Sequence, residues 1–235
     1  MSSRFLKTLQ EKKFSLVASL PENNYELAKA AWEAGVDAIK VHINCFHRAS
    51  QNTFGTLDSN RELFERIIKD SPVPVGIVAG QDTETAEGLI DELAKMGFDF
   101  ISLYGHHTPV NLIKRNDLAN FFAVDYTYSF EEIDAVSNSF VADILELSIC
   151  DPTTYGLRLN ARDLARYERI AKNAKIPTVV PTQRVVKPED VKALYRCGVK
   201  AVMVGAISYG KTVETISSTL KEFRREIDNL WKLLV

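Results

Sequence analysis

Short, almost wholly apolar runs alternate along this chain with longer segments in which apolar residues recur every third or fourth position. Runs without a polar face are typical of strands buried on both sides of a parallel sheet, and the wider spacing is typical of amphipathic helices. The pattern predicts strands over residues 14–20, 38–43, 73–80, 98–104, 121–126, 143–149, 178–181 and 201–205. It predicts helices over 23–34, 59–69, 83–96, near 110–116, from Ser129 onward, over 161–174, between Pro188 and Gly198, and over 212–234.

The stretch 176–208 shows the repeating unit most clearly. A strand is followed by a helix that begins with Pro188 and two acidic residues and ends at Gly198, and then by a second strand. The pieces EAGVDAIKV, KMGFDFISL and RCGVKAVMV repeat the helix end, the glycine and the buried strand, and VPVGIVAG resembles IPTVVPT. Strand–helix alternation is typical of α/β proteins. The likeness of the two halves favours a closed barrel over an open sheet, so we expect residues 1–235 to form a single (β/α)8 TIM-barrel domain.

Charged residues occupy alternate positions on several of these strands. In the strand over 38–43, the apolar residues can face the helices only if Lys40 and His42 point into the barrel, because a charge between strand and helix would be costly to bury. The same reasoning turns other polar side chains inward on the strands over 98–104, 121–126 and 143–149. Ionisable groups near the C-terminal strand ends of such a barrel are typical of an active site. The candidate catalytic residues are Lys40, His42, Tyr104, His106, Asp125 and Glu146.

These groups suggest chemistry beside a carbonyl, with several assignments open. Glu146 or Asp125 would be the base, and Lys40 would stabilise an enolate-like oxygen or form a Schiff base. A histidine, His42 or His106, would be the partner acid or would bind a divalent metal with the carboxylates. Because strands two and six contribute to the same layers of a barrel, we expect Lys40 and Glu146 to pair, with Tyr104 between them. The alternative is an internal ion pair without chemistry.

The polar segment 44–58 follows the second strand and is long for a connection within a compact domain. Such segments are usually lids, binding loops or disordered. We expect a mobile lid in which His47, Arg48 and Asn52 close over a substrate, with a passive loop as the alternative.

Composition narrows the possible partners. The formal net charge of −2 gives no electrostatic case for binding nucleic acid or an anionic membrane. Three cysteines without paired spacing favour a reducing compartment, and no apolar run approaches the roughly 20 residues of a membrane span. We expect a cytoplasmic protein, with no nucleotide cofactor indicated and a homo-oligomer left open.

The segment KPEDVKALYRCGVKAVMVGAIS resembles the phosphate-binding, or ribulose-phosphate-binding, branch of TIM barrels. In that branch the turns after strands seven and eight hold a phosphate on backbone N–H groups and a helix N-terminus. The turn is most similar to the Glu-Gly-Arg-Ile of N-acetylmannosamine-6-phosphate 2-epimerases, with Thr182 in place of the catalytic Glu. The resemblance implies a phosphate site at Thr182, Gln183, Arg184, Gly205 and Ala206, where Arg184 would pair with the anion directly.

The segment SLVASLPENNYEL and the triplet Thr53-Phe54-Gly55 resemble ribulose-phosphate 3-epimerases. Lys40 stands where that family has a metal-binding His, and His42 where it has an Asp. Together the resemblances imply an isomerase, epimerase, lyase or aldolase-type enzyme for a small phosphorylated metabolite, acting at the C-terminal face of the barrel. A non-catalytic barrel that binds a phosphorylated ligand, as a sensor or structural subunit, is the alternative.

Overall fold

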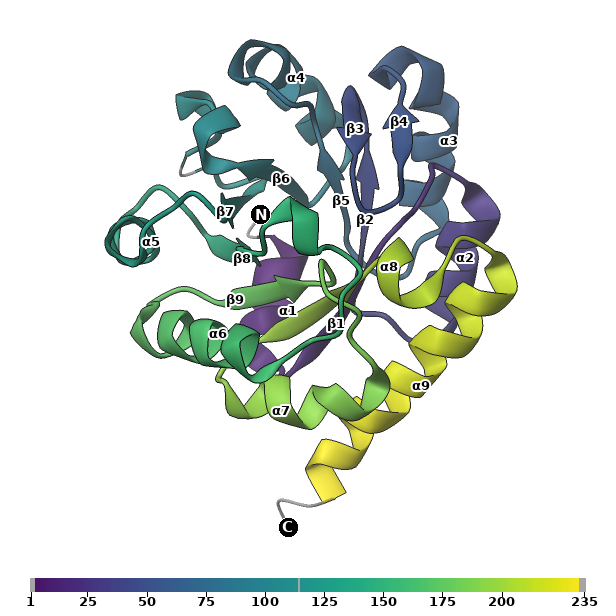
Figure 1. The fold of residues 1–235 in the computed structure, drawn as a ribbon. Coiled ribbons are helices and arrows are strands. Elements are labelled where there is room, and N and C mark those ends of the chain that lie inside the picture. The colour runs from purple at the N-terminus through teal and green to yellow at the C-terminus, as the bar shows by residue number, and fades with distance from the viewer. Residues whose placement is uncertain (1–2, 114, 233–235) are drawn as a thin grey trace.

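The computed structural model describes residues 3–113 and 115–232. Parallel strands close into a barrel in which β1 pairs with both β2 and β10, the last strand along the chain (Figure 1). The expected (β/α)8 fold is therefore confirmed. In order around the barrel the strands are β1 (Ser15–Ser19), β10 (Ala201–Val204), β9 (Thr178–Pro181), β8 (Ile144–Ser148), β7 (Ala119–Asp125), β6 (Phe100–Tyr104), β5 (Val75–Val78) and β2 (Ala38–His42).

Helices surround this barrel, and short polar side chains set where they begin. Asn24, Asp82 and Asn160 accept hydrogen bonds from backbone N–H groups of the first turns that follow them. Ser129 and Glu132 form a reciprocal capping box. The outer helices are α2 (Tyr25–Glu33), α3 (Leu57–Asp70), α4 (Thr83–Met96), α5 (Phe130–Ser137), α6 (Ala161–Asn173), α7 (Val191–Arg196) and α9 (Val213–Lys232).

Two expected helices differ from the observed ones. The short helix expected near 110–116 is only a 3-10 turn, Val110–Leu112, and residue 114 lies outside the described residues. The last helix, α9, is followed as far as Lys232, so the expected end at 233–234 also lies outside them. A further short helix, α8 (Ala206–Tyr209), follows β10. Within the described ranges, no helix is both long and apolar enough to cross a membrane.

The sequence pattern did not reveal α1 (Arg4–Glu11), which closes the N-terminal end of the barrel. Phe5 and Leu9 are fully buried in one cluster with Phe100 and other residues of the barrel interior. Asp99 fixes the start of this helix, because its carboxylate accepts hydrogen bonds from the Ser3 hydroxyl at 2.7 Å and from two backbone N–H groups at 2.8 and 2.9 Å. The interior is therefore filled from this end, and open space remains at the opposite face.

Gly76 on β5 allows the Phe100 ring to lie against the strand inside the barrel. A Cβ at this position would lie 2.0 Å from the ring carbon Cε2. We expect Gly76→Ala to destabilise the fold by about 1–3 kcal/mol, since the ring has to move within a packed interior. Gly88→Ala is the control. No atom lies within 4 Å of its added Cβ, and alanine there should be neutral or stabilising by up to about 1 kcal/mol. Urea unfolding measures both, and equal effects would contradict this account.

Candidate active site

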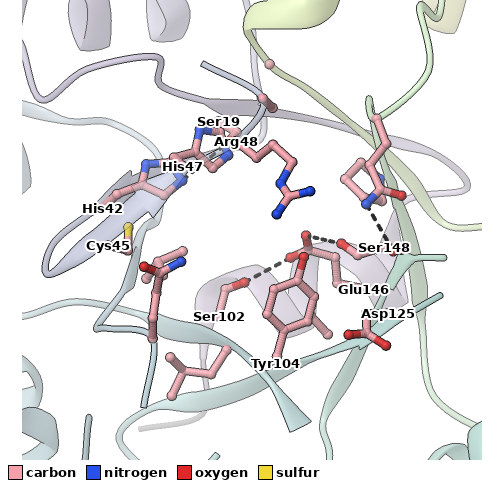
Figure 2. A pocket seen from close by; sticks show the side chains of 18 of the residues that line it. Ser19, His42, Cys45, His47, Arg48, Ser102, Tyr104, Asp125, Glu146 and Ser148 are labelled. Atoms are coloured by element: carbon pink, nitrogen blue, oxygen red, sulfur yellow. Dashed lines mark hydrogen bonds between the residues drawn. The ribbon is translucent and has the colours of Figure 1, made fainter. Parts of the chain in front are cut away.

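A cavity of about 380 Å³ opens at the C-terminal ends of the barrel strands. It is lined by strand ends and by the loops that follow them, as expected for a catalytic face in this fold. Figure 2 shows side chains from β2, β6, β7 and β8 converging on it. Of the sequence-predicted residues, it is lined by Lys40, His42, His47, Arg48, Tyr104, His106, Asp125, Glu146, Thr182, Gln183 and Gly205.

An ion pair lies at the floor of the cavity. The Lys40 ammonium contacts Glu146 Oε2 at 3.1 Å, and both side chains are less than a tenth exposed. Two hydroxyls hold the same carboxylate: Ser102 donates to Oε2 at 2.9 Å and Ser148 donates to Oε1 at 3.0 Å (Figure 2). Charge and hydrogen bonds thus fix Glu146 from three sides.

Asp125, the other candidate base, is held differently. Its Oδ1 accepts hydrogen bonds from the Thr127 backbone N–H at 2.9 Å and the Thr127 hydroxyl at 2.6 Å, within the turn that ends β7. The carboxylate lines the cavity but also serves this turn. Glu146 is therefore the better placed of the two carboxylates for proton transfer at the floor.

Tyr104 lies beside Glu146 at the end of β6 (Figure 2). Burial, followed by the nearby Tyr155 and Glu146, raises the pKa of the Tyr104 phenol well above its usual value, so the phenol keeps its proton at neutral pH. The His106 ring stacks parallel to it at 5.5 Å between centroids. A protonated phenol at this position is a hydrogen-bond donor for a bound ligand.

His42 lies at the end of β2 and is fully buried. Its ring packs against His47 at 4.4 Å and against Phe54 at 4.7 Å, and its Nε2 is 3.5 Å from the Ser19 hydroxyl. Burial, then the charges of His47 and Lys40, lowers the pKa of His42 well below its usual value. Burial and Lys40 likewise lower the pKa of His47 from 6.5 to about 4. Both rings are therefore neutral at pH 7.

The low pKa of His47 makes stability depend on pH. The unfolded chain takes up the proton below its pKa of 6.5, whereas the folded protein resists it down to about 4, so stability falls as the pH drops through this window. Between pH 7 and pH 4 we expect the free energy of unfolding to fall by roughly 2 kcal/mol more in the wild type than in His47→Gln, after allowance for partial exposure of the ring. Urea unfolding of both proteins at the two pH values measures the difference. Parallel loss in both would refute this role for His47.

The segment after β2 forms a hairpin, and its expected mobility as a lid stays a prediction. Strands β3 (Cys45–His47) and β4 (Asn52–Phe54) pair antiparallel, and α3 begins at Leu57. Asn52 does not line the cavity; its amide donates to the Pro21 carbonyl at 3.2 Å and anchors the hairpin. His47 and Arg48 do line the cavity.

The corner between β9 and β10 also differs from the expected phosphate site. Arg184 forms an ion pair with Asp163 on α6 at 2.9 Å instead of facing the cavity. The Gly205 N–H donates to the Thr182 hydroxyl at 2.8 Å. Ala206 begins α8 and does not line the cavity. The Gln183 side chain is tied to the loop after β8, where it accepts from the Cys150 N–H at 2.9 Å and donates to the Ser148 carbonyl at 3.0 Å.

Three residues join the site beyond the predicted set. Strand alternation turned Ser102 and Ser148 inward with Glu146, but neither was among the candidate catalytic residues. Tyr155 contacts Gln183 from the irregular loop after β8, where no periodic pattern indicates a side chain's direction. No group of three or more His, Cys, Asp or Glu side chains in the described part of the chain is arranged to hold a metal ion.

No protein-family model matches this chain, and no curated protein matches it. Solved structures do match over most of their length. A mutant tryptophan synthase alpha-subunit from Pyrococcus furiosus has a TM-score of 0.70 at 17% identity, covering 90% of this chain and 98% of that one. A thiamine phosphate pyrophosphorylase from the same organism has a TM-score of 0.63 at 17% identity, and the match covers 93% of this chain and 97% of that one. A phosphoribosylanthranilate isomerase from Thermotoga maritima has a TM-score of 0.60 at 13% identity, and the match covers 92% of this chain and 99% of that one. Identities this low show the shared barrel fold alone.

Proposed function

We propose that this chain is an enzyme that transfers a proton, or makes or breaks a carbon–carbon bond, beside the carbonyl of a small phosphorylated metabolite. The observation that carries the proposal is the buried Lys40–Glu146 pair, 3.1 Å apart at the floor of an open cavity. A barrel interior that only packs is filled with branched apolar side chains. A cation and a carboxylate held together there supply the two groups that enolate chemistry requires.

The proposed step begins when a carbonyl enters between the two side chains. Glu146 takes the proton from the neighbouring carbon, and the C–H electron pair moves into the carbon–carbon bond while the carbonyl π pair becomes an enolate oxyanion. Lys40 stabilises that oxygen with its positive charge, which is held in a buried site where charges interact strongly. Return of the proton to either face, or to the adjacent carbon, completes an epimerisation or an isomerisation. In a lyase reaction Glu146 would take a hydroxyl proton instead, and the carbon–carbon bond would break to give the same enolate.

The ion-paired state favours this role for Lys40 over a Schiff base. A Schiff base needs a neutral amine that attacks the carbonyl carbon, whereas Lys40 contacts a carboxylate and lies 3.5 Å from the Ser102 hydroxyl. The choice of a phosphorylated metabolite rests on two supports. The Arg48 guanidinium lines the cavity, and two of the structural neighbours are named for phosphorylated compounds.

Hydrogen exchange tests the proposal whichever product the reaction forms. The protein is incubated in D2O with a panel of phosphorylated ketoses, aldoses, N-acetyl sugars and keto acids, and proton NMR follows the signals beside each carbonyl. We expect enzyme-dependent loss of such a signal, or conversion, for at least one member, and none for its unphosphorylated counterpart. Saturable binding of a panel member without exchange would favour the non-catalytic barrel. The absence of both would reject the proposed substrate class.

A further inference from the structure

The cavity offers few cations for an anionic ligand. Of the described residues that line it, Lys40 and Arg48 are the ones with an ammonium or guanidinium group. Lys40 is buried against Glu146, so an anion that used it would separate an ion pair and face the freed carboxylate. The fully buried His42 and the partly buried His47 are neutral at pH 7, because burial lowers the pKa of each ring. Arg48 is the remaining charge among these side chains.

Several groups at the corner between β9 and β10 already have partners inside the protein. The Arg184 guanidinium contacts Asp163 and donates to the Thr154 carbonyl at 2.9 Å. The Gly205 N–H is held by Thr182, and the Gln183 N–H donates to the Pro181 carbonyl at 2.9 Å. Each of these contacts would have to break before the group could bind a phosphate, which makes the corner a weaker anion site than its sequence suggests.

The backbone of Arg48, by contrast, is fixed in a position that needs no rearrangement. The Gln51 N–H and the Gln51 side-chain amide both donate to the Arg48 carbonyl, at 3.3 and 2.6 Å. Asn52 holds the hairpin to the loop after β1. Gln81 holds it to the loop after β5, because its side-chain amide accepts from the Phe46 N–H at 2.9 Å and donates to the Phe46 carbonyl at 3.2 Å. The base of the Arg48 side chain is therefore held in place over the cavity.

Arg48 is an exposed residue, and its guanidinium forms no hydrogen bond or ion pair with any residue the structure describes, although its charge helps to lower the pKa of Asp151. In Figure 2 it extends from the hairpin into the cavity, toward Ser148 and Glu146. A guanidinium presents a planar fork of donors that matches two phosphate oxygens at once. Arg48 thus has a fixed backbone and a guanidinium without a hydrogen-bonded partner at an open cavity, and this arrangement suits a side chain that binds an anion.

We propose that Arg48 is the phosphate-binding residue of this cavity, in place of the corner between β9 and β10. The phosphate monoester would lie at the rim under the hairpin, and the carbonyl end of the same molecule would reach the Lys40–Glu146 pair at the floor. The second half of this statement rests on the proposed function, whereas the phosphate site itself does not. The substrate class is then a short chain that carries its phosphate at one end and its carbonyl toward the other.

Inorganic phosphate is the probe, and its dissociation constant is measured by 31P NMR titration at constant ionic strength. We expect saturable binding to the wild type, binding at least about tenfold weaker in Arg48→Ala, and an intermediate value in Arg48→Lys. Arg225→Ala removes an exposed arginine of α9, 68% exposed, and should match the wild type. Thr182→Val tests the competing corner and should also bind as the wild type does.

Two results would overturn the site: no saturable phosphate binding by the wild type, or equal binding by wild type and Arg48→Ala. A changed phosphate affinity in Thr182→Val, in either direction, with no loss of affinity in Arg48→Ala would move the anion to the corner, because the variant frees the Gly205 N–H that Thr182 holds. Failure of the proposed function looks different. If Arg48→Ala binds phosphate more weakly but no carbonyl compound exchanges its protons, the phosphate site is supported and the proposed enolate chemistry is rejected. If exchange depends on Glu146 but the KM of the phosphorylated substrate is unchanged in Arg48→Ala, the proposed chemistry is supported and the phosphate site at Arg48 is rejected.

Discussion

Glu146→Gln should lower the rate of proton exchange on the reactive panel compound by about 10³-fold, within the range that a positioned general base contributes. Glutamine keeps the shape of the side chain and can still accept from Ser102 or Ser148, but it cannot take a proton. The KM should change far less than kcat, because the loss lies in the transition state. Single-turnover NMR in D2O measures the rate, and circular dichroism confirms that the variant is folded.

Asp125→Asn is the matched control in the same cavity. Its carboxylate serves the turn at Thr127, so we expect less than about a tenfold loss of rate. The reverse result, in which Asp125→Asn stops exchange and Glu146→Gln does not, would make Asp125 the base and leave Glu146 as a structural group.

Lys40→Met should lower the free energy of unfolding by about 3–5 kcal/mol, because it leaves the buried Glu146 carboxylate without its cation. The two serine hydroxyls remain, but they do not neutralise a charge. The double variant Lys40→Met/Glu146→Leu removes both charges and fills their space with apolar atoms, and we expect it to recover most of that loss. The double variant should be inactive even though it is stable.

Urea unfolding of the wild type, Lys40→Met, Glu146→Leu and the double variant gives the coupling energy between the two side chains. Losses that simply add would mean that the pair is not energetically coupled. A single variant within about 1 kcal/mol of the wild type would show that water reaches the floor of the cavity and screens the charges.

The position of the Lys40–Glu146 pair could be predicted because it follows from a local rule with a large energy behind it. A charged side chain on a barrel strand can point only into the barrel or toward the surrounding helices, and the apolar layer beneath the helices makes the second direction costly. The same rule placed Asp125 at the cavity but said nothing of the turn at Thr127 that occupies it. The direction of a side chain was therefore predictable, whereas the partner it binds was not.

Contacts between distant segments explain the remaining differences. The partner of Arg184 is Asp163, on a separate helix, and no pattern within either segment reveals that the two meet. The hairpin after β2 depends on Pro21 and Gln81 from two other loops, so its sequence read as an unstructured polar segment. In α1 the two fully buried side chains, Phe5 and Leu9, span barely more than one turn, which is too short a period to separate a barrel plug from an ordinary leading segment.

The pairing of β1 with β10 has a consequence for the way the chain is made on the ribosome. Leu16 aligns with Val202, so the first strand gains its second neighbour only when nearly the whole barrel has been synthesised. At roughly 5–20 residues per second, β1 waits about 10–40 s with one edge unpaired. An apolar strand with an open edge is a template for pairing with another chain. The nascent protein thus carries an unpaired strand edge throughout this interval, until β10 pairs with β1 and closes the barrel.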